Sequence, residues 1–438
     1  MNKNEVIIIG GGLAGCEAAW QLAEAGIRVR LYEMKPQQYS PAHRMEGLAE
    51  LVCSNSFRSD EPETAIGLLK EEMRSLGSLV LDAAGETRVP AGKALAVDRV
   101  LFSRVISEKI ATHPNITVVR KEIATLDDPE LGPAETIVVA AGPLAGESLT
   151  QSLGKVVGVA QLYFYDAIAP IVFTESVDMT KAFWGSRYRP EEDDYLNCPM
   201  SEEEYFRFRE ALLAGEKVAC REFEREIHFE GCLPIETMAE RGELTMAFGP
   251  LKPKGLPDPR TGKEPFAVVQ LRAENREKSM LNLVGFQTKL KYPEQKRIFS
   301  MIPGLENADF VRLGSIHRNT FVNAPRVLSP DLELTKRPGI FLAGQITGVE
   351  GYVESAACGL WVGVLLARKL KGQPLVAPPQ ETVLGSLLVH LQTESKNFQP
   401  MNANFGLTPP LKARGGKAKR KLMYAQRARE AWKAWKDS

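Results

Sequence analysis

The stretch VIIIGGGLAG, residues 6–15, decides the fold of the N-terminal part of this chain. Its first four residues are apolar and mostly branched, which is typical of a strand buried in a parallel sheet. Apolar residues then recur at helical spacing from Leu13, and Gly26 predicts the helix end. Residues 28–33 (RVRLYE) follow as a second strand. The segment is therefore a β-turn-α-β unit, the opening of a doubly wound α/β sheet.

The glycines of this stretch form a GxGxxG pattern between the strand and the helix. Gly10 permits a tight turn, Gly12 lets the backbone approach a pyrophosphate, and Gly15 permits close helix–strand packing. The free N–H groups at the helix N-terminus favour phosphate, and an acidic residue at the end of the second strand can accept from a ribose hydroxyl. These features predict a dinucleotide site made of Gly10, Gly12, Leu13, Ala14, Gly15 and Glu33.

Two later elements favour FAD over NAD as the dinucleotide. Residues 137–142 form an apolar strand that ends in Ala-Gly, and residues 339–344 form another that ends in glycine before a helix. In two-domain flavoproteins such elements contact the flavin in this order. Gln345 stands where most of these proteins have Asp, and its amide can still bond a hydroxyl. The predicted FAD contacts are Ala141, Gly142, Gly344, Gln345, Gly351 and Tyr352.

The length of 438 residues fits about three domains or one large domain with an insertion. We predict a Rossmann-like FAD domain of the glutathione-reductase type, formed by residues 1–160 and 330–371. An inserted α+β domain is expected at 161–329, and a basic helical appendage at 372–438. Helices are expected at 64–76, 100–111 and 351–370, strands at 117–120 and 136–140, and irregular loops at 36–62 and 248–265.

The charge balance of 55 basic and 55 acidic side chains conceals an asymmetry. Residues 412–438 carry a net charge of +8, so the rest of the chain carries −8. A local basic segment keeps a nucleic-acid partner possible although the net charge is zero. No apolar run reaches the ~18 residues of a membrane span, and no export signal is recognisable, so we expect a cytoplasmic protein.

The six cysteines include no CxxC pair, and the sequence predicts neither a disulfide framework nor a metal site. Cys16 and Cys358 lie in apolar helical patterns and fit the role of small buried residues. Cys53 and Cys232 are flanked by turn residues instead. A loop thiol near cationic groups can act as a nucleophile, and the residues alone leave this role and a buried role about equally open for both.

Several long motifs resemble one family closely. They include ELVCSNSFRS at 50–59, FEGCLPIE at 229–236, HRNTFVNAP at 317–325 and GVEGYVESAACG at 348–359. With FQPMNANFGLTPPL at 398–411 and others, they extend over most of the chain. On these motifs the chain is similar to the folate- and FAD-dependent tRNA uracil-5-methyltransferases, which make ribothymidine at uridine 54 of the T-loop. That family itself lacks the usual Asp, which accounts for Gln345.

The resemblance implies a set of roles. Cys232 is implied to attack uracil C6 and Cys53 to assist near the flavin. Methylenetetrahydrofolate supplies the carbon, NAD(P)H reduces FAD, and reduced folate stacks on the flavin with His317 against its other face. Arg318 and Glu350 are our own candidates for contacts with folate or uridine. The implied partner is the tRNA T-arm, reached in part through Lys and Arg at 412–421, Lys252, Lys254 and Arg260, with no membrane and no obligate protein partner.

Three alternatives stay open at this point. A sibling flavoprotein modifies wobble uridines with the same cofactors, but it carries a large helical C-terminal domain for which this chain is too short. A small-molecule FAD oxidoreductase fits less well with two loop cysteines and a basic tail. A flavin-bound RNA-binding protein without catalysis would show no turnover with folate and NAD(P)H.

Overall fold

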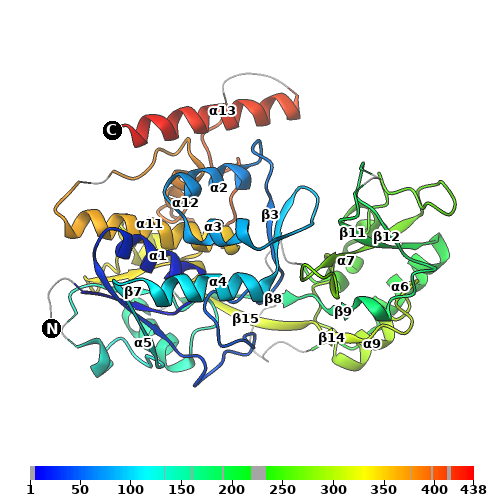
Figure 1. Cartoon of the computed structure of the whole chain (residues 1–438), viewed down its shortest axis with the longest axis horizontal. Coiled ribbons are helices and arrows are strands. Elements are labelled where there is room, and N and C mark those ends of the chain that lie inside the picture. The colour runs from blue at the N-terminus through cyan, green and yellow to red at the C-terminus, as the bar shows by residue number, and fades with distance from the viewer. Residues whose placement is uncertain are drawn as a thin grey trace.

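The computed structural model describes residues 5–132, 134–158, 161–189, 192–218, 233–374, 376–395, 398–411 and 416–438. Figure 1 shows two bodies side by side, joined by a long two-stranded ribbon, with a C-terminal helix lying along the top of the first body. The first body is built from both ends of the chain, and the second from its middle. Within the described residues, no helix is both long and apolar enough to cross a membrane.

A five-stranded parallel sheet forms the centre of the first body. Its order is β16 (Ile340–Leu342), β7 (Ile137–Val139), β1 (Glu5–Ile9), β2 (Arg28–Glu33) and β6 (Ile116–Arg120). All four pairings are parallel, and Ile8 lies in register with Leu31 on one side and Val138 on the other. The strands are apolar on both faces because helices cover both sides of such a sheet. The doubly wound α/β fold predicted from residues 6–33 is confirmed.

The helices α1 (Leu13–Glu24) and α11 (Tyr352–Leu370) pack together at unusually short range. A Cβ atom on Gly359 would lie 2.1 Å from the carbonyl oxygen of Ala14, and one on Gly363 would lie 2.9 Å from that of Ala18. Only small residues on both helices permit this approach. The contact brings the N-termini of α1 and α11 to the same edge of the sheet, where the strands β1, β7 and β16 end.

The second body has its own sheet and its own core. Its strand order is β10 (Phe183–Trp184), β11 (Tyr195–Met200), β12 (Ala267–Ala273), β13 (Met280–Leu283), β9 (Ile171–Phe173) and β14 (Phe310–Arg312), all antiparallel. Apolar side chains of the sheet pack against helices α6 (Glu202–Ala214), α7 (Ile235–Arg241), α8 (Thr245–Phe248) and α9 (Tyr292–Phe299). The limits of the domains stay a prediction, but this separate core lies within the middle of the chain.

The ribbon between the bodies pairs β8 (Gln161–Ile168) with β15 (Ser315–Val322). The two strands are antiparallel, and His317 lies opposite Asp166. Figure 1 shows the ribbon passing from the first body toward the second. The ribbon therefore brings residues of the middle of the chain close to the parallel sheet of the first body.

The remaining elements cover the first body. A small sheet, β3 (Ser56–Ser59), β5 (Ala94–Val97) and β4 (Arg88–Val89), lies within the segment between β2 and β6. The first body also contains five further helices: α2 (Ala65–Ser75), α3 (Leu79–Glu86), α4 (Arg99–Thr112), α5 (Glu147–Val157) and α10 (Ala324–Val327). The sequence predicted an irregular loop at 36–62, but β3 lies within it. The prediction missed this strand because only its pairing with the distant β5 defines it.

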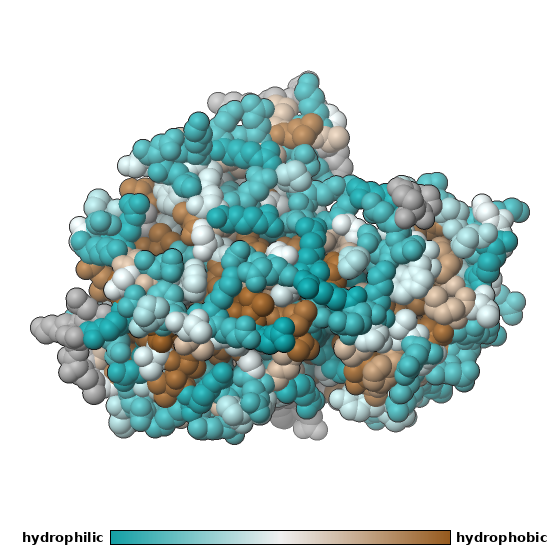
Figure 2. Space-filling model, viewed as in Figure 1, coloured by the Kyte–Doolittle hydropathy of each residue, from teal (hydrophilic) through white to brown (hydrophobic). Residues whose placement is uncertain are grey.

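Two C-terminal helices pack on α2. The first, α12 (Val383–His390), belongs to the main core, and both oxygens of the buried Glu72 carboxylate accept N–H groups of its first residues at 2.8 Å. The second, α13 (Lys417–Lys436), buries Ala425, Ala428 and Trp432 against the first body. Its other residues are largely charged, and Figure 2 shows a mostly hydrophilic outer surface along the top of the molecule.

Candidate functional site

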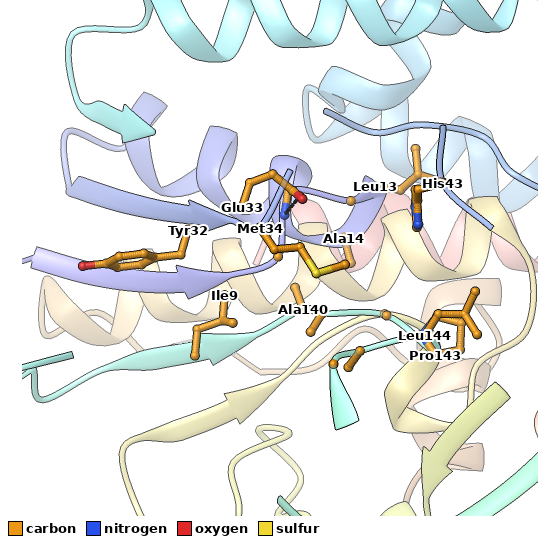
Figure 3. A pocket seen from close by; sticks show the side chains of 18 of the residues that line it. Ile9, Leu13, Ala14, Tyr32, Glu33, Met34, His43, Ala140, Pro143 and Leu144 are labelled. Carbon is orange, nitrogen blue, oxygen red and sulfur yellow. Dashed lines mark hydrogen bonds between the residues drawn. The ribbon is translucent and has the colours of Figure 1, made fainter. Parts of the chain in front are cut away.

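A cavity of about 1150 Å³, counting the part open to solvent, lies where β1, β7 and β16 end. Ten of the twelve predicted FAD contacts line it, and only Gly15 and Gly351 lie behind its wall. Figure 3 shows Glu33, Met34, Ala14 and Ala140 around one part of the cavity, with His43, Pro143 and Leu144 at the other. Three glycine-containing turns that are far apart in the sequence thus form one site.

The three fingerprint glycines have different surroundings. Gly10 has a φ of +107°, and a Cβ there would lie 2.5 Å from the carbonyl oxygen of Ala140. A Cβ on Gly15 would lie 1.8 Å from the carbonyl oxygen of Gly10. A Cβ on Gly12 would meet no atom within 4 Å, so its side faces open space. Gly10 and Gly15 are thus required by the fold, whereas Gly12 leaves room for a ligand at the N-terminus of α1.

Glu33 is buried at the end of β2 and turned toward the glycine loop. Its Oε2 accepts from the N–H of Gly11 at 2.9 Å, and its Oε1 accepts from the N–H of Lys35 at 3.0 Å. Each carboxylate oxygen has a second lone pair, so both can accept a further hydrogen bond from a ribose. The acceptor oxygens of Glu33 and the open side of Gly12 fit an adenine dinucleotide.

The third turn differs from the expectation in how Gln345 is used. Its Nε2 donates to Oε2 of Glu350 at 2.5 Å, so the amide nitrogen serves a protein partner. Glu350 is 6% exposed. Burial, and then the charges of Asp166 and Glu354, raise the pKa of Glu350 well above its ordinary value. Glu350 therefore keeps its proton to a higher pH than an ordinary glutamate does, and Gln345 keeps its oxygen for other contacts.

The loop that carries Cys53 adjoins this cavity through Tyr352. The Tyr352 hydroxyl accepts from the backbone N–H of Cys53 at 2.7 Å and from that of Ser54 at 3.2 Å. Arg99 donates to the carbonyl oxygen of Leu51 at 3.0 Å. The Cys53 thiol is half-buried and lies 3.8 Å from the carbonyl oxygen of Ala167 on β8. Residues from α4, α11 and the ribbon thus hold this thiol at the junction of the two bodies.

Asn55 connects the same loop to the second body. Its Nδ2 donates to the carbonyl oxygens of Val97 at 2.9 Å and Ala273 at 2.8 Å, while its Oδ1 accepts from Nε of Arg272 at 2.9 Å. Asn55 is fully buried, so all three bonds replace contacts with water. The position of Cys53 therefore depends on how β12 packs against the first body.

The ribbon brings His317 close to the loop of the first body that carries His43. Nε2 of His317 lies 2.9 Å from Oγ of Ser315. Burial, and then the charges of Arg312, Arg44 and His43, lower the pKa of His317. The pKa of His43 is lowered too, by burial and by Lys35. Both imidazoles thus favour the neutral form, which suits stacking against a ring.

Other predicted residues lie elsewhere or outside the described part of the chain. Cys232 and the first basic residues of the tail, Lys412 and Arg414, fall outside it, as does the side chain of Arg318. Cys16 and Cys358 are buried, and burial raises the pKa of each thiol, which confirms their interpretation as core residues. Arg260 pairs with Asp258 at 2.7 Å, and Lys254 lies 3.6 Å from Glu264.

Sequence reasoning missed the arginines around Cys53. Arg99, Arg272 and Arg312 come from α4, β12 and β14, and nothing in their local sequence distinguishes them from surface arginines. Two of them lie in stretches that also carry the family resemblance, Arg99 in ALAVDR at 94–99 and Arg272 in AVVQLRAEN at 267–275, and this was the signal that could have found them. Across the described part of the chain, no group of three or more His, Cys, Asp and Glu side chains is placed to hold a metal ion.

Comparison with known proteins identifies the family of this chain. A protein of Oleidesulfovibrio alaskensis named methylenetetrahydrofolate–tRNA-(uracil-5-)-methyltransferase TrmFO is 64% identical over 428 residues, which cover 98% of this chain and 96% of that protein. A protein of Geobacter sulfurreducens with the same name is 59% identical, with 97% and 96% covered. This chain belongs to the TrmFO family. The resemblance found in the motifs is thereby confirmed.

A family model described as Glucose inhibited division protein A matches residues 5–374 of this TrmFO-family chain. Among solved structures, Aquifex aeolicus GidA superimposes with a TM-score of 0.69 at 16% identity, covering 98% of this chain and 73% of that one. At this identity the likeness shows the fold alone. It agrees with the two-body arrangement seen in Figure 1.

Proposed function

We propose that this protein methylates C5 of uridine 54 in the T-loop of tRNA, with methylenetetrahydrofolate as carbon donor, FAD as cofactor and NAD(P)H as reductant. The carrying observation is the hydrogen bond of Tyr352 to the Cys53 loop, which places a half-buried thiol beside a dinucleotide cavity. The relatives named as folate-dependent tRNA uracil methyltransferases support the substrates. We place the reaction in the cytoplasm, where tRNA is processed.

FAD fits the described residues. Gly12 and the α1 N-terminus would hold its pyrophosphate, Glu33 its adenosine ribose, and the turns at Gly142 and Gly344 the flavin half. When bound, FAD supplies the two electrons that convert a methylene into a methyl group. Glu350 accepts from Gln345, which lines this cavity, and Tyr352 closes the side toward Cys53.

A cysteine nucleophile is needed because uracil C5 is poorly reactive by itself. A thiolate that adds to C6 makes C5 nucleophilic, because the electrons of the C5–C6 double bond move into an enolate. We assign this attack to Cys232 and an assisting role at the same base to Cys53. We assign the neutral ring of His317 to stacking against folate, with Arg318 and Glu350 as further contacts.

The tRNA would approach along the basic helix. Lys419, Arg420 and Lys421 at the start of α13 are exposed, and none of them forms an ion pair with another described residue. In Figure 1 this end of α13 is the one nearer the second body. Uncompensated cations on one helix suit a phosphate backbone, and the target base must be flipped out to reach the cavity. No protein partner is required by this scheme.

The deciding experiment is incubation of the flavin-loaded protein with unmodified tRNA, methylenetetrahydrofolate and NAD(P)H, followed by nucleoside analysis. We expect ribothymidine at position 54, none without folate, and none when S-adenosylmethionine replaces folate. A Cys232→Ala variant should keep its yellow colour and lose methyl transfer. A product at the wobble uridine, or full activity of Cys232→Ala, would contradict the proposal.

A further inference from the structure

Arg312 is partly buried, and the described residues leave two of its covered nitrogens without hydrogen bonds. It ends β14, opposite Ile171 of β9, at a point where the pairing of these strands is irregular. Its Nε and Nη2 are inaccessible to solvent, and neither has a partner among the described residues. A guanidinium stays charged in proteins, and leaving such donors buried and unpaired is costly. A ligand that accepts from both nitrogens would remove this cost.

The neighbours of Arg312 do not neutralise it. We define the arginine cluster as Arg99, Arg272 and Arg312 together with Glu274. Glu274 is the one carboxylate of this cluster, and it lies 2.6 Å from Nη2 of Arg99. Nε of Arg272 already donates to Asn55, and Nη1 of Arg99 to Leu51. Three cations thus share one anion. Nε of Arg99 also lacks a hydrogen bond, but Arg312 is the member of the cluster with neither a hydrogen bond on its Nε and Nη2 nor an ion pair among the described residues.

Arg312 lies near residues that surround the Cys53 thiol. The charges of Arg99, Glu274, Tyr352 and Cys53 all act on Arg312, and Arg312 in turn acts on His317. Arg312 is therefore near both the Cys53 thiol, which adjoins the dinucleotide cavity, and the His317 imidazole on the ribbon. A flat heterocycle bound between them would lie near this guanidinium.

We propose that Arg312 is a substrate-binding residue that donates through Nε and Nη2 to a ring carbonyl, the amide edge that uracil and the pterin of folate have in common. The inference rests on the proposed function. For uracil the bond also strengthens during reaction: as the S–C6 bond forms, the C5–C6 electron pair shifts toward C4 and the negative charge of the thiolate moves to O4. A fixed cation at that oxygen stabilises the enolate more than the ground state.

The test separates uracil from pterin. The flavin-loaded protein is mixed, without folate, with a T-arm hairpin that carries 5-fluorouridine at position 54, and covalent adduct is followed on denaturing gels. Folate affinity is measured separately by quenching of flavin fluorescence with tetrahydrofolate. Arg312→Gln removes the charge, Arg312→Lys keeps the charge without the planar fork, and Arg297→Gln on exposed α9 is the control.

We expect Arg312→Gln to slow adduct formation by at least about tenfold, with a smaller loss for Arg312→Lys and none for Arg297→Gln. If instead tetrahydrofolate affinity falls at least about tenfold and the adduct rate is unchanged, the carbonyl bound is that of the pterin. Wild-type rates and affinities in both Arg312 variants would overturn the inference. A wild-type protein that forms neither adduct nor ribothymidine would refute the proposed function instead.

Thermal unfolding tests whether Arg312 has a purely structural role. Arg312→Met keeps part of the unbranched apolar stem and removes a partly buried charge that no described residue pairs, so the melting temperature of this variant should equal or exceed that of the wild type. Its adduct rate or its folate affinity should still fall as in Arg312→Gln. A lower melting temperature together with wild-type adduct formation and folate binding would show that Arg312 supports the fold only, and would overturn the inference.

Discussion

The hydroxyl of Tyr352 accepts a hydrogen bond from the backbone of Cys53 at 2.7 Å, although 299 residues separate them in sequence. Tyr352 begins α11 beside the cavity, and Cys53 lies on a loop between β2 and β3. One phenol therefore couples the geometry of the thiol to that of the cofactor cavity.

Tyr352→Phe removes the acceptor for two backbone N–H groups, those of Cys53 and Ser54. We expect a loss of about 1–3 kcal/mol in unfolding free energy. Methyl transfer should fall at least about tenfold, because the thiol loses its fixed position, while FAD stays bound. Denaturant unfolding and ribothymidine assays measure both. Tyr292→Phe, at an exposed site on α9, should change neither. Equal behaviour of the two variants would contradict this coupling.

Gly12→Ala and Gly15→Ala should separate binding from folding. A methyl group on Gly12 enters open space, so the apoprotein should keep its melting temperature while FAD affinity falls about tenfold or more. A methyl group on Gly15 would lie 1.8 Å from the Gly10 carbonyl oxygen, so this variant should lose about 1–3 kcal/mol of stability. Calorimetry and flavin titration distinguish the outcomes. A Gly12→Ala protein with unchanged FAD affinity would mean that the pyrophosphate lies elsewhere.

Glu350 predicts a pH dependence of stability. Its folded-state pKa is raised above the ordinary value of 4.5, so the folded protein binds an extra proton above that pH. Stability is then fully present below about pH 4.5 and decreases as pH rises through the folded pKa. Glu350→Gln mimics the protonated form and should give a flatter curve of unfolding free energy from pH 5 to 8. Glu108→Gln, exposed on α4, should follow the wild type; parallel curves for all three proteins would refute the prediction.

The start of α13 predicts salt-sensitive tRNA binding. Replacing Lys419, Arg420 and Lys421 by Gln should weaken tRNA binding and lower the slope of log affinity against log salt by about one for each phosphate that the helix no longer binds. Methyl transfer at saturating tRNA should stay near the wild-type rate. The same charge change at Lys291, which precedes α9, and at Lys296 and Arg297 on α9 is the control. An unchanged salt slope in the α13 variant would remove this helix from the interface.

The local parts of this protein were predictable because neighbouring residues determine them. Branched apolar residues 6–9, the glycine turn and Glu33 specify a β-turn-α-β unit, since strand period, helix period and glycine sterics act over a few residues. The resemblance to known motifs added the cysteines and His317. Strand β3 and the place of α12 in the main core escaped prediction, because each depends on a partner far along the chain.

Tertiary structure alone decided the surroundings of the thiol. Arg99, Arg272 and Arg312 look like ordinary charged residues in sequence, yet β12 and β14 bring two of them to the Cys53 loop from the second body. The covered, unpaired nitrogens of Arg312 and the raised pKa of Glu350 likewise arise only when water is excluded between distant segments. Sequence by itself determined the nucleotide fold, because its signals are local. Packing of the two bodies decided the chemistry of the site, because desolvation and hydrogen-bond geometry are properties of contacts between them.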